Sequence, residues 1–115
     1  MQKYTVKWTD DAINDFDNII GYIVKENETN AKSMFFSIKE QCQNLDLFPL
    51  RGHVIPELQT LGFTDYRELI YKRWRIIYSL EGQNVYLLLI IDSRQDMQEQ
   101  LVQRVLNYEI KQEYK

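Results

Sequence analysis

Three apolar runs, separated only by short polar breaks, constrain the fold of this chain more than any other feature. They span residues 66–71, 74–80 and 85–92 and are rich in aromatic and β-branched side chains, which favour strands. Residues 81–84 contain a glycine and an asparagine, which adopt positive φ readily in a tight hairpin. The runs therefore predict a three-stranded antiparallel meander. The third run is apolar on both faces, so we expect it to be covered on both sides.

The first half of the chain predicts a strand followed by two helices. Residues 4–8 alternate apolar and polar side chains, as a half-buried strand does. After Thr9, an expected N-cap, apolar residues recur at three- and four-residue steps. The same spacing returns after Thr29 or Asn30, either of which can cap a second helix. These neighbouring helices predict an antiparallel helical hairpin, which Pro49 should end.

The remaining segments connect and close the fold. We expect residues 49–64 to be an irregular crossing from the helices to the sheet. Asp96 and Glu99 have the spacing of a capping box, and the apolar stripe after them predicts a C-terminal helix. The expected class is α+β: an N-terminal strand, an antiparallel helical hairpin, a three-stranded antiparallel meander and a C-terminal helix. Residues 1–108 should form a single domain, and 109–115 a polar C-terminal tail that frays.

Composition excludes several classes of protein. With 115 residues, 44% of them hydrophobic and 27% charged, the chain is large enough for one core and carries no signature of disorder. Its N-terminus does not resemble an export signal, and no apolar stretch approaches the ~18 residues that span a membrane. The lone Cys42 predicts no internal disulfide, and no Cys/His cluster predicts zinc. We therefore expect no cofactor, no membrane partner and a cytoplasmic location.

A spaced set of arginines in and beside the predicted sheet carries the chemistry. Arg67 and Arg75 lie inside strands, and Arg94 follows the last one. A guanidinium is a planar, permanently charged fork of donors that suits phosphate or carboxylate. Since the net charge is −3 and the pI is near 5.1, any basic site must be local. In the alternative interpretation, the arginines form ion pairs with Glu57, Glu68, Asp92 and Asp96.

Strand register decides whether Arg67 and Arg75 share a face of the sheet. If residues 72–73 form a two-residue turn, Tyr71 pairs with Trp74 and the two arginines lie on opposite faces. Neither lysine nor arginine favours the positive φ of such a turn, so we expect an odd insertion that pairs Tyr71 with Arg75. Arg67 and Arg75 would then share one face, with the third arginine at its edge.

Other side chains are weaker candidates for chemistry. Tyr78 can donate or accept a proton, although a ring in such a strand is first a packing element. His53 can transfer protons near neutral pH, but no arrangement around it specifies a triad. Cys42 lies on an apolar stripe and is expected to be a buried hydrophobe. Glu57 and Glu68 can act as a general base, or more simply as ion-pair partners.

The chain resembles the RelE/ParE toxin superfamily over almost its whole length. The resemblance rests on the ordered combination of Tyr-Arg-Glu at 66–68, Trp-Arg-Ile-Ile-Tyr at 74–78 and Ile-Asp-Ser-Arg-Gln-Asp at 91–96. The loop segments 48–52 and 56–58 look like the ParE-type branch. The resemblance implies a growth-inhibiting toxin of a bacterial type II toxin-antitoxin pair, of the kind linked to plasmid stabilization. Its partner would be a cognate antitoxin whose extended or helical segment wraps it.

Two mechanisms occur among such toxins. RelE-like members cleave mRNA in the ribosomal A site, whereas ParE-like members poison DNA gyrase without known nuclease chemistry. Under the nuclease interpretation, the catalytic groups would be Arg67, Arg75, Arg94 and Tyr78. This chain lacks the tyrosine or histidine that RelE-like nucleases carry at or after the end of the sheet, which favours the ParE-like interpretation with DNA gyrase as target. The alternatives are a RelE-like mRNA endonuclease and a non-toxic binding module with the same fold.

Overall fold

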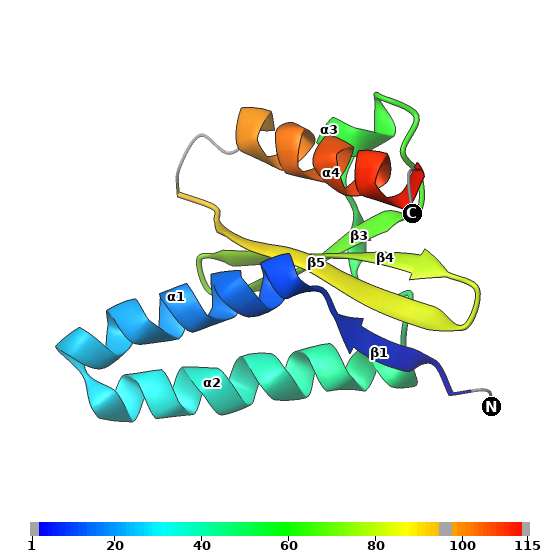
Figure 1. Cartoon of the computed structure of the whole chain (residues 1–115). Coiled ribbons are helices and arrows are strands. Elements are labelled where there is room, and N and C mark those ends of the chain that lie inside the picture. Colours follow the sequence, from blue (N-terminus) through cyan, green and yellow to red (C-terminus); the bar gives the residue numbers. More distant parts are fainter. Residues whose placement is uncertain (1–2, 95–97, 114–115) are drawn as a thin grey trace.

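One mixed five-stranded sheet organises the chain (Figure 1). The computed structural model describes residues 3–94 and 98–113. The spatial order of the strands is β1-β5-β4-β3-β2, with β1 parallel to β5 and the other neighbours antiparallel. The predicted meander is confirmed, and an edge strand on each side widens it. The strands are β1 (Thr5–Trp8), β2 (His53–Val54), β3 (Tyr66–Tyr71), β4 (Trp74–Glu81) and β5 (Asn84–Asp92).

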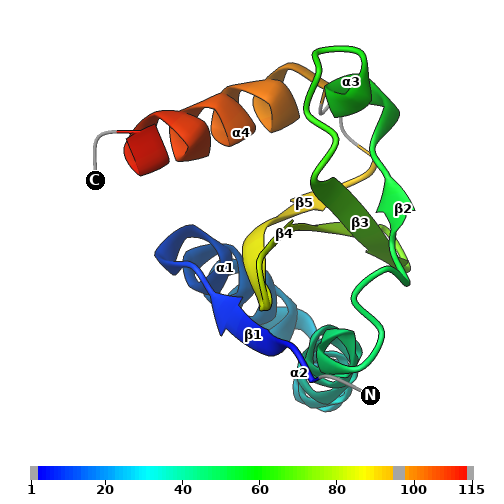
Figure 2. The same cartoon turned by 90° about the vertical axis from the view of Figure 1, so that its right-hand side faces the viewer.

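Helices cover both faces of this sheet, as the two views together show (Figures 1 and 2). The antiparallel pair α1 and α2 lies on one face, and α3 and α4 lie on the other. None of the described helices is long and apolar enough to cross a membrane. The helices are α1 (Asp10–Glu26), α2 (Glu28–Gln43), α3 (Pro56–Gln59) and α4 (Gln98–Glu113), with the short 3-10 helix η1 (Asn44–Asp46) after α2.

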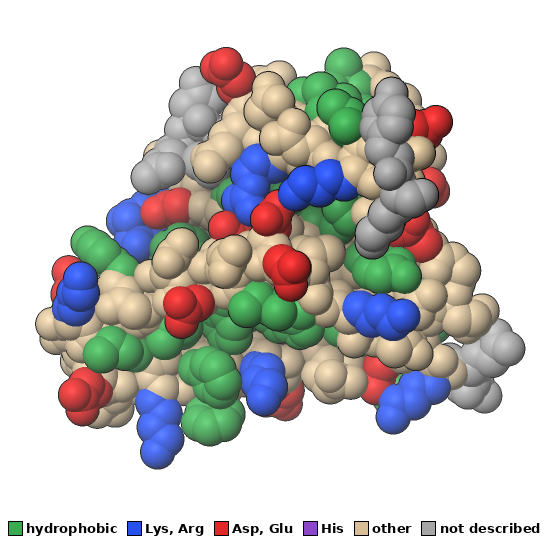
Figure 3. Space-filling model, viewed as in Figure 1, with side chains coloured by type: hydrophobic (Ala, Val, Ile, Leu, Met, Phe, Trp, Pro, Cys, Tyr) green, Lys and Arg blue, Asp and Glu red, His purple; other side chains and the backbone are tan. Residues whose placement is uncertain are grey.

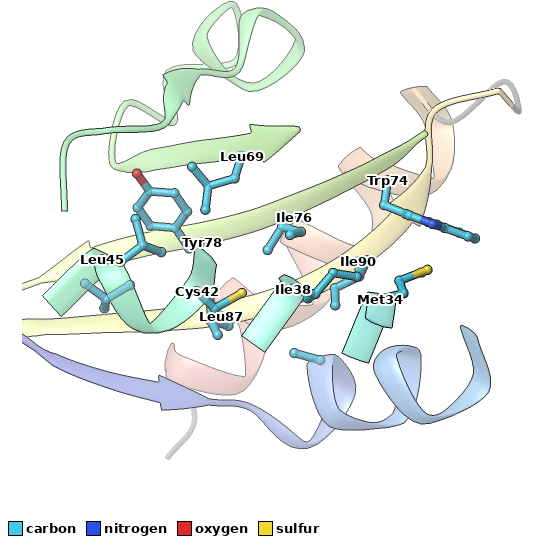
Figure 4. Close-up of a cluster of buried hydrophobic side chains, with 12 residues drawn as sticks. Met34, Ile38, Cys42, Leu45, Leu69, Trp74, Ile76, Tyr78, Leu87 and Ile90 are labelled. Carbon is cyan, nitrogen blue, oxygen red and sulfur yellow. The ribbon is translucent and has the colours of Figure 1, made fainter. Parts of the chain in front are cut away.

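The sheet separates two hydrophobic cores, and β5 contributes to both. Leu87 and Ile90 pack into the core under α1 and α2, while Leu89 and Ile91 pack into the core under α4. Figure 4 shows the first core, which extends from Trp74 at one end of the sheet to the ring of Tyr78 near the other. The expectation that this strand is covered on both sides is confirmed.

The boundaries of the helical hairpin differ partly from those predicted. Thr9 caps α1 as expected, and its hydroxyl oxygen accepts the Ala12 N–H at 3.2 Å. The cap of α2 is Asn27, not Thr29 or Asn30, because the Asn27 side chain accepts the Asn30 N–H at 3.0 Å. Regular helix ends at Gln43, followed by η1, so Pro49 lies beyond the end that it was expected to set.

Two segments expected to be irregular are more ordered than predicted. Residues 49–64 contain β2, which pairs with β3, and α3, whose first residue is Pro56, where a missing N–H costs nothing. The polar tail from residue 109 is helical through Glu113 instead of frayed. The Tyr66 hydroxyl donates a hydrogen bond to Glu109 and so ties this end of α4 to β3. The predicted cap, Asp96, lies outside the described residues.

The register between β3 and β4 contradicts the prediction. Tyr71 pairs with Trp74, so residues 72–73 form a two-residue turn and Arg67 and Arg75 lie on opposite faces. Lys72 adopts φ 55°, and positive φ at the first of two turn residues is typical of a type II′ hairpin. The left-handed conformation costs a residue with a Cβ roughly 1–2 kcal/mol, which the continuous ladder offsets. A bulge beside Ile77 also shifts the register between β4 and β5 by one residue, so that Ile91 lies opposite Arg75.

Candidate functional site

Arg67 and Tyr78 pair across β3 and β4 and hold a loop. The Arg67 guanidinium donates to the Gly52 carbonyl oxygen at 2.8 Å. The Tyr78 hydroxyl donates to the Pro49 carbonyl oxygen at 2.7 Å and accepts the Gly52 N–H at 2.9 Å. Tyr78 is fully buried, and this burial raises the pKa of its hydroxyl. Both side chains therefore position the segment that leads into β2.

Arg75 lies on the opposite face, between two carboxylates. Its Nη1 donates to Glu57 Oε2 at 3.0 Å, and its Nε donates to Glu68 Oε2 at 2.9 Å. The Arg75 side chain is only 14% exposed. The hydrogen bond from Arg75 outweighs the effect of partial burial and lowers the pKa of Glu57. The ion-pair alternative is therefore confirmed for Arg75, which fastens α3 to β3 and β4.

Arg94 lies just beyond the end of β5, away from both other arginines. Its side chain is 63% exposed and pairs with Asp92 at 3.4 Å. Asp92 also faces the Nε of Arg73 at 3.5 Å. Burial acts to raise the pKa of Asp92, but hydrogen bonds from Arg94 and the charges of Arg94 and Arg73 together lower it. The three predicted site arginines are therefore distributed over the two faces and one end of the sheet.

The structure instead gathers Arg94 with Lys72, Arg73 and Trp74 around one cavity of about 530 Å³. The facing ends of α1 and α2 form its other wall, so the cavity lies between the β3–β4 turn and the end of the helical hairpin. We call this cavity the tip pocket. The sequence draws attention to the cationic turn 72–73, but no pattern indicates that the end of the helical hairpin lies opposite it.

A second hollow, of about 480 Å³, lies between α4 and the start of α1. Acidic and basic side chains meet on the surface where α4 lies above α1 (Figure 3). Arg104 of α4, which lines this hollow, pairs with Asp15 at 2.9 Å. Asp15 also accepts the backbone N–H of Ile90 at 2.9 Å. Sequence spacing gives no sign of this link, which joins α4 to α1 beside β5.

The remaining candidates do not assemble a reactive group. His53 is an exposed residue of the two-residue edge strand β2. Burial raises the pKa of the Cys42 thiol to about 12, in keeping with the predicted packing role. Within the described residues, no three His, Cys, Asp or Glu side chains are grouped to hold a metal ion.

Solved structures with this fold include toxin-antitoxin systems. The chromosomal ParDE system from P. aeruginosa aligns with a TM-score of 0.64 and 20% identity, covering 80% of this chain and 98% of the other. The RelBE2 toxin-antitoxin complex from Mycobacterium tuberculosis aligns with a TM-score of 0.55 and 19% identity, covering 78% of this chain and 98% of the other. No curated protein sequence matches significantly. The fold is thus that of small α+β proteins found in toxin-antitoxin complexes.

The family assignment is more specific than the fold. The sequence profile described as the ParE toxin of the type II toxin-antitoxin system parDE matches residues 6–97, well over half of the chain. The chain belongs to this ParE toxin family.

Proposed function

We propose that this ParE-family toxin acts by binding a protein, with DNA gyrase as its target, and that a cognate antitoxin neutralises it in the cytoplasm. The ParDE and RelBE2 structures are toxin-antitoxin systems, which supports an antitoxin as the first partner. The choice of gyrase follows from the ParE-like sequence resemblance and the matching family profile.

The separation of the candidate catalytic groups is the observation that carries this proposal. RNA cleavage requires a base for the 2′-hydroxyl, an acid for the leaving oxygen and cations around one phosphate. Here Arg67 and Arg75 lie on opposite faces, and Arg75 is held by two carboxylates. Tyr78 is fully buried and bonded to the backbone. This separation of the candidate groups supports a binding mechanism over nuclease chemistry.

Controlled expression in bacteria separates this proposal from its alternatives. A gyrase poison should arrest DNA replication and induce the SOS response before protein synthesis falls, and co-expression of the antitoxin from the adjacent gene should restore growth. Rapid translation arrest with cleaved mRNA would instead support the RelE-like alternative. Normal growth at high expression would support the non-toxic binding module.

A further inference from the structure

The tip pocket has an electrostatic character opposite to that of the whole chain. Three cationic side chains line it, Lys72, Arg73 and Arg94, against one lining carboxylate, Glu26, and the adjacent Asp92, which pairs with both arginines. The chain as a whole carries a formal charge of −3. A local excess of positive charge in a cleft raises the local concentration of anionic groups there, even on a protein that is acidic as a whole.

The guanidiniums in this pocket are incompletely paired. Asp92 is shared between Arg73 and Arg94, at 3.5 Å and 3.4 Å. The Nε of Arg73 is buried against Asp92 and is closed to a ligand, whereas the Arg94 side chain is 63% exposed. The Lys72 ammonium lies 5.5 Å from the Tyr71 ring centre, a contact that leaves its three donors available. The pocket therefore offers more donors than the described part of the chain satisfies.

Apolar and neutral polar surface adjoins these charges. The Arg73 guanidinium lies 4.4 Å from the centre of the Trp74 ring, which forms part of the wall. Tyr22, 59% exposed, and Met34 line the opposite wall, together with the amide of Asn30. The volume of about 530 Å³ is in the range of pockets that enclose small ligands or a few side chains. Such a surface suits a carboxylate that is next to an apolar side chain.

We propose that the tip pocket binds an acidic segment of a partner protein. One carboxylate of this segment faces Arg94 and Arg73, and an adjoining apolar side chain packs between Tyr22 and Trp74. The occupant that we assign is a segment of the antitoxin, and to that extent the proposal rests on the proposed function. A folded polyphosphate such as ribosomal RNA is disfavoured, because the net charge of −3 opposes its approach.

Fluorescence of Trp74 tests this proposal directly. Trp8→Phe leaves Trp74 as the only tryptophan and keeps an aromatic ring on Phe16. The probes are three capped pentapeptides in which leucine alternates with glutamate, glutamine or lysine. The glutamate peptide should give a saturable change that weakens as salt is added, and the other two should give none.

Charge reversal then locates the binding site. Lys72→Glu with Arg94→Glu should weaken glutamate-peptide binding roughly 10- to 100-fold, the loss expected when charge-assisted hydrogen bonds are removed. Lys7→Glu with Lys111→Glu makes the same change in net charge at the second hollow and should alter binding less than about twofold. Arg94→Gln alone, at a largely exposed side chain, should retain the fold and still weaken binding about tenfold.

Each contrary result overturns the proposal. Equal binding of the glutamate and glutamine peptides would show that the site does not recognise a carboxylate. Equal losses of binding in the two charge-reversal pairs would show that the peptide does not bind at the tip pocket. Preference for inorganic phosphate or a single-stranded RNA oligonucleotide would make the site a phosphate site. Gyrase inhibition is measured separately, without antitoxin. If the toxin does not inhibit gyrase but the glutamate peptide binds as expected, the proposed function is refuted and the peptide-binding role of the tip pocket is not.

Discussion

Replacing Arg75 by alanine should destabilise the protein by about 2–3 kcal/mol. The substitution removes every hydrogen bond from Arg75 to Glu57 and Glu68 and leaves two carboxylates facing one another. Breaking a fully buried ion pair costs about 3–5 kcal/mol. Here the side chains of Arg75, Glu57 and Glu68 are 14%, 25% and 9% exposed, so partial screening by water reduces the cost.

The pH dependence of this loss has a definite sign. In the wild type, the pKa of Glu57 is lowered from its usual value of 4.5. The contribution of the pair is therefore complete above that value and is lost as pH falls through the lower folded-state pKa. In Arg75→Ala this lowering of the Glu57 pKa disappears, because its largest cause is the hydrogen bond from Arg75. The difference in stability between wild type and variant should be largest near neutral pH and shrink below about pH 4.

Urea unfolding followed by circular dichroism measures the free energy of unfolding at each pH. In a separate thermal unfolding experiment at neutral pH, we expect a midpoint about 10 °C lower for the variant. Arg51→Ala, at an arginine that bonds only to Gln41 among the described side chains, is the control and should change stability by less than about 0.5 kcal/mol. Arg75→Met with Glu57→Gln and Glu68→Met should recover most of the loss. A change below 0.5 kcal/mol for Arg75→Ala, or one independent of pH, would refute the reasoning.

Three further substitutions test the loop and the turn. Gly52→Ala should destabilise the protein by about 2 kcal/mol or more, because the new Cβ would lie 2.6 Å from the Tyr78 hydroxyl oxygen and 2.7 Å from a backbone carbonyl oxygen. The control is Gly21→Ala, which has open space around it and should stabilise the protein by up to about 1 kcal/mol. Equal effects of the two substitutions on stability would contradict this account. Tyr78→Phe should cost about 1–3 kcal/mol in urea unfolding by leaving the Gly52 N–H without its partner, and a neutral result would mean that water replaces the hydroxyl. Lys72→Gly should raise the thermal midpoint by relieving φ 55°, and a lower midpoint would show that the lysine side chain stabilises the turn.

Patterning predicted the large elements of this fold. The alternation in residues 4–8, the helical spacing after Thr9 and the three apolar runs each depend on local periodicity, and each corresponds to an observed element. The edge strand β2 and the short α3 were not predicted, because two and four residues carry no measurable period. Tertiary contacts stabilise these two elements: β2 pairs with β3, and Glu57 of α3 forms an ion pair with Arg75.

The arrangement of the candidate site was harder to predict from the sequence, because it depends on the length of the β3–β4 turn to within one residue. A residue more or less between Tyr71 and Trp74 moves Arg75 to the other face, and the low propensity of Lys72 for positive φ pointed to the wrong length. The continuous pairing from Tyr66 to Trp74 outweighs that local cost. The tip pocket depends on contacts between the β3–β4 turn and the distant end of the helical hairpin, which no local pattern specifies.

Supercoiling of relaxed plasmid by purified gyrase, in the presence of the purified toxin, tests the central proposal most directly. We predict that the toxin inhibits supercoiling in a dose-dependent manner, that the cognate antitoxin relieves the inhibition, and that Arg67→Ala remains inhibitory whenever it is folded. Full gyrase activity at saturating toxin, together with cleavage of mRNA on ribosomes by the same preparation, would contradict it.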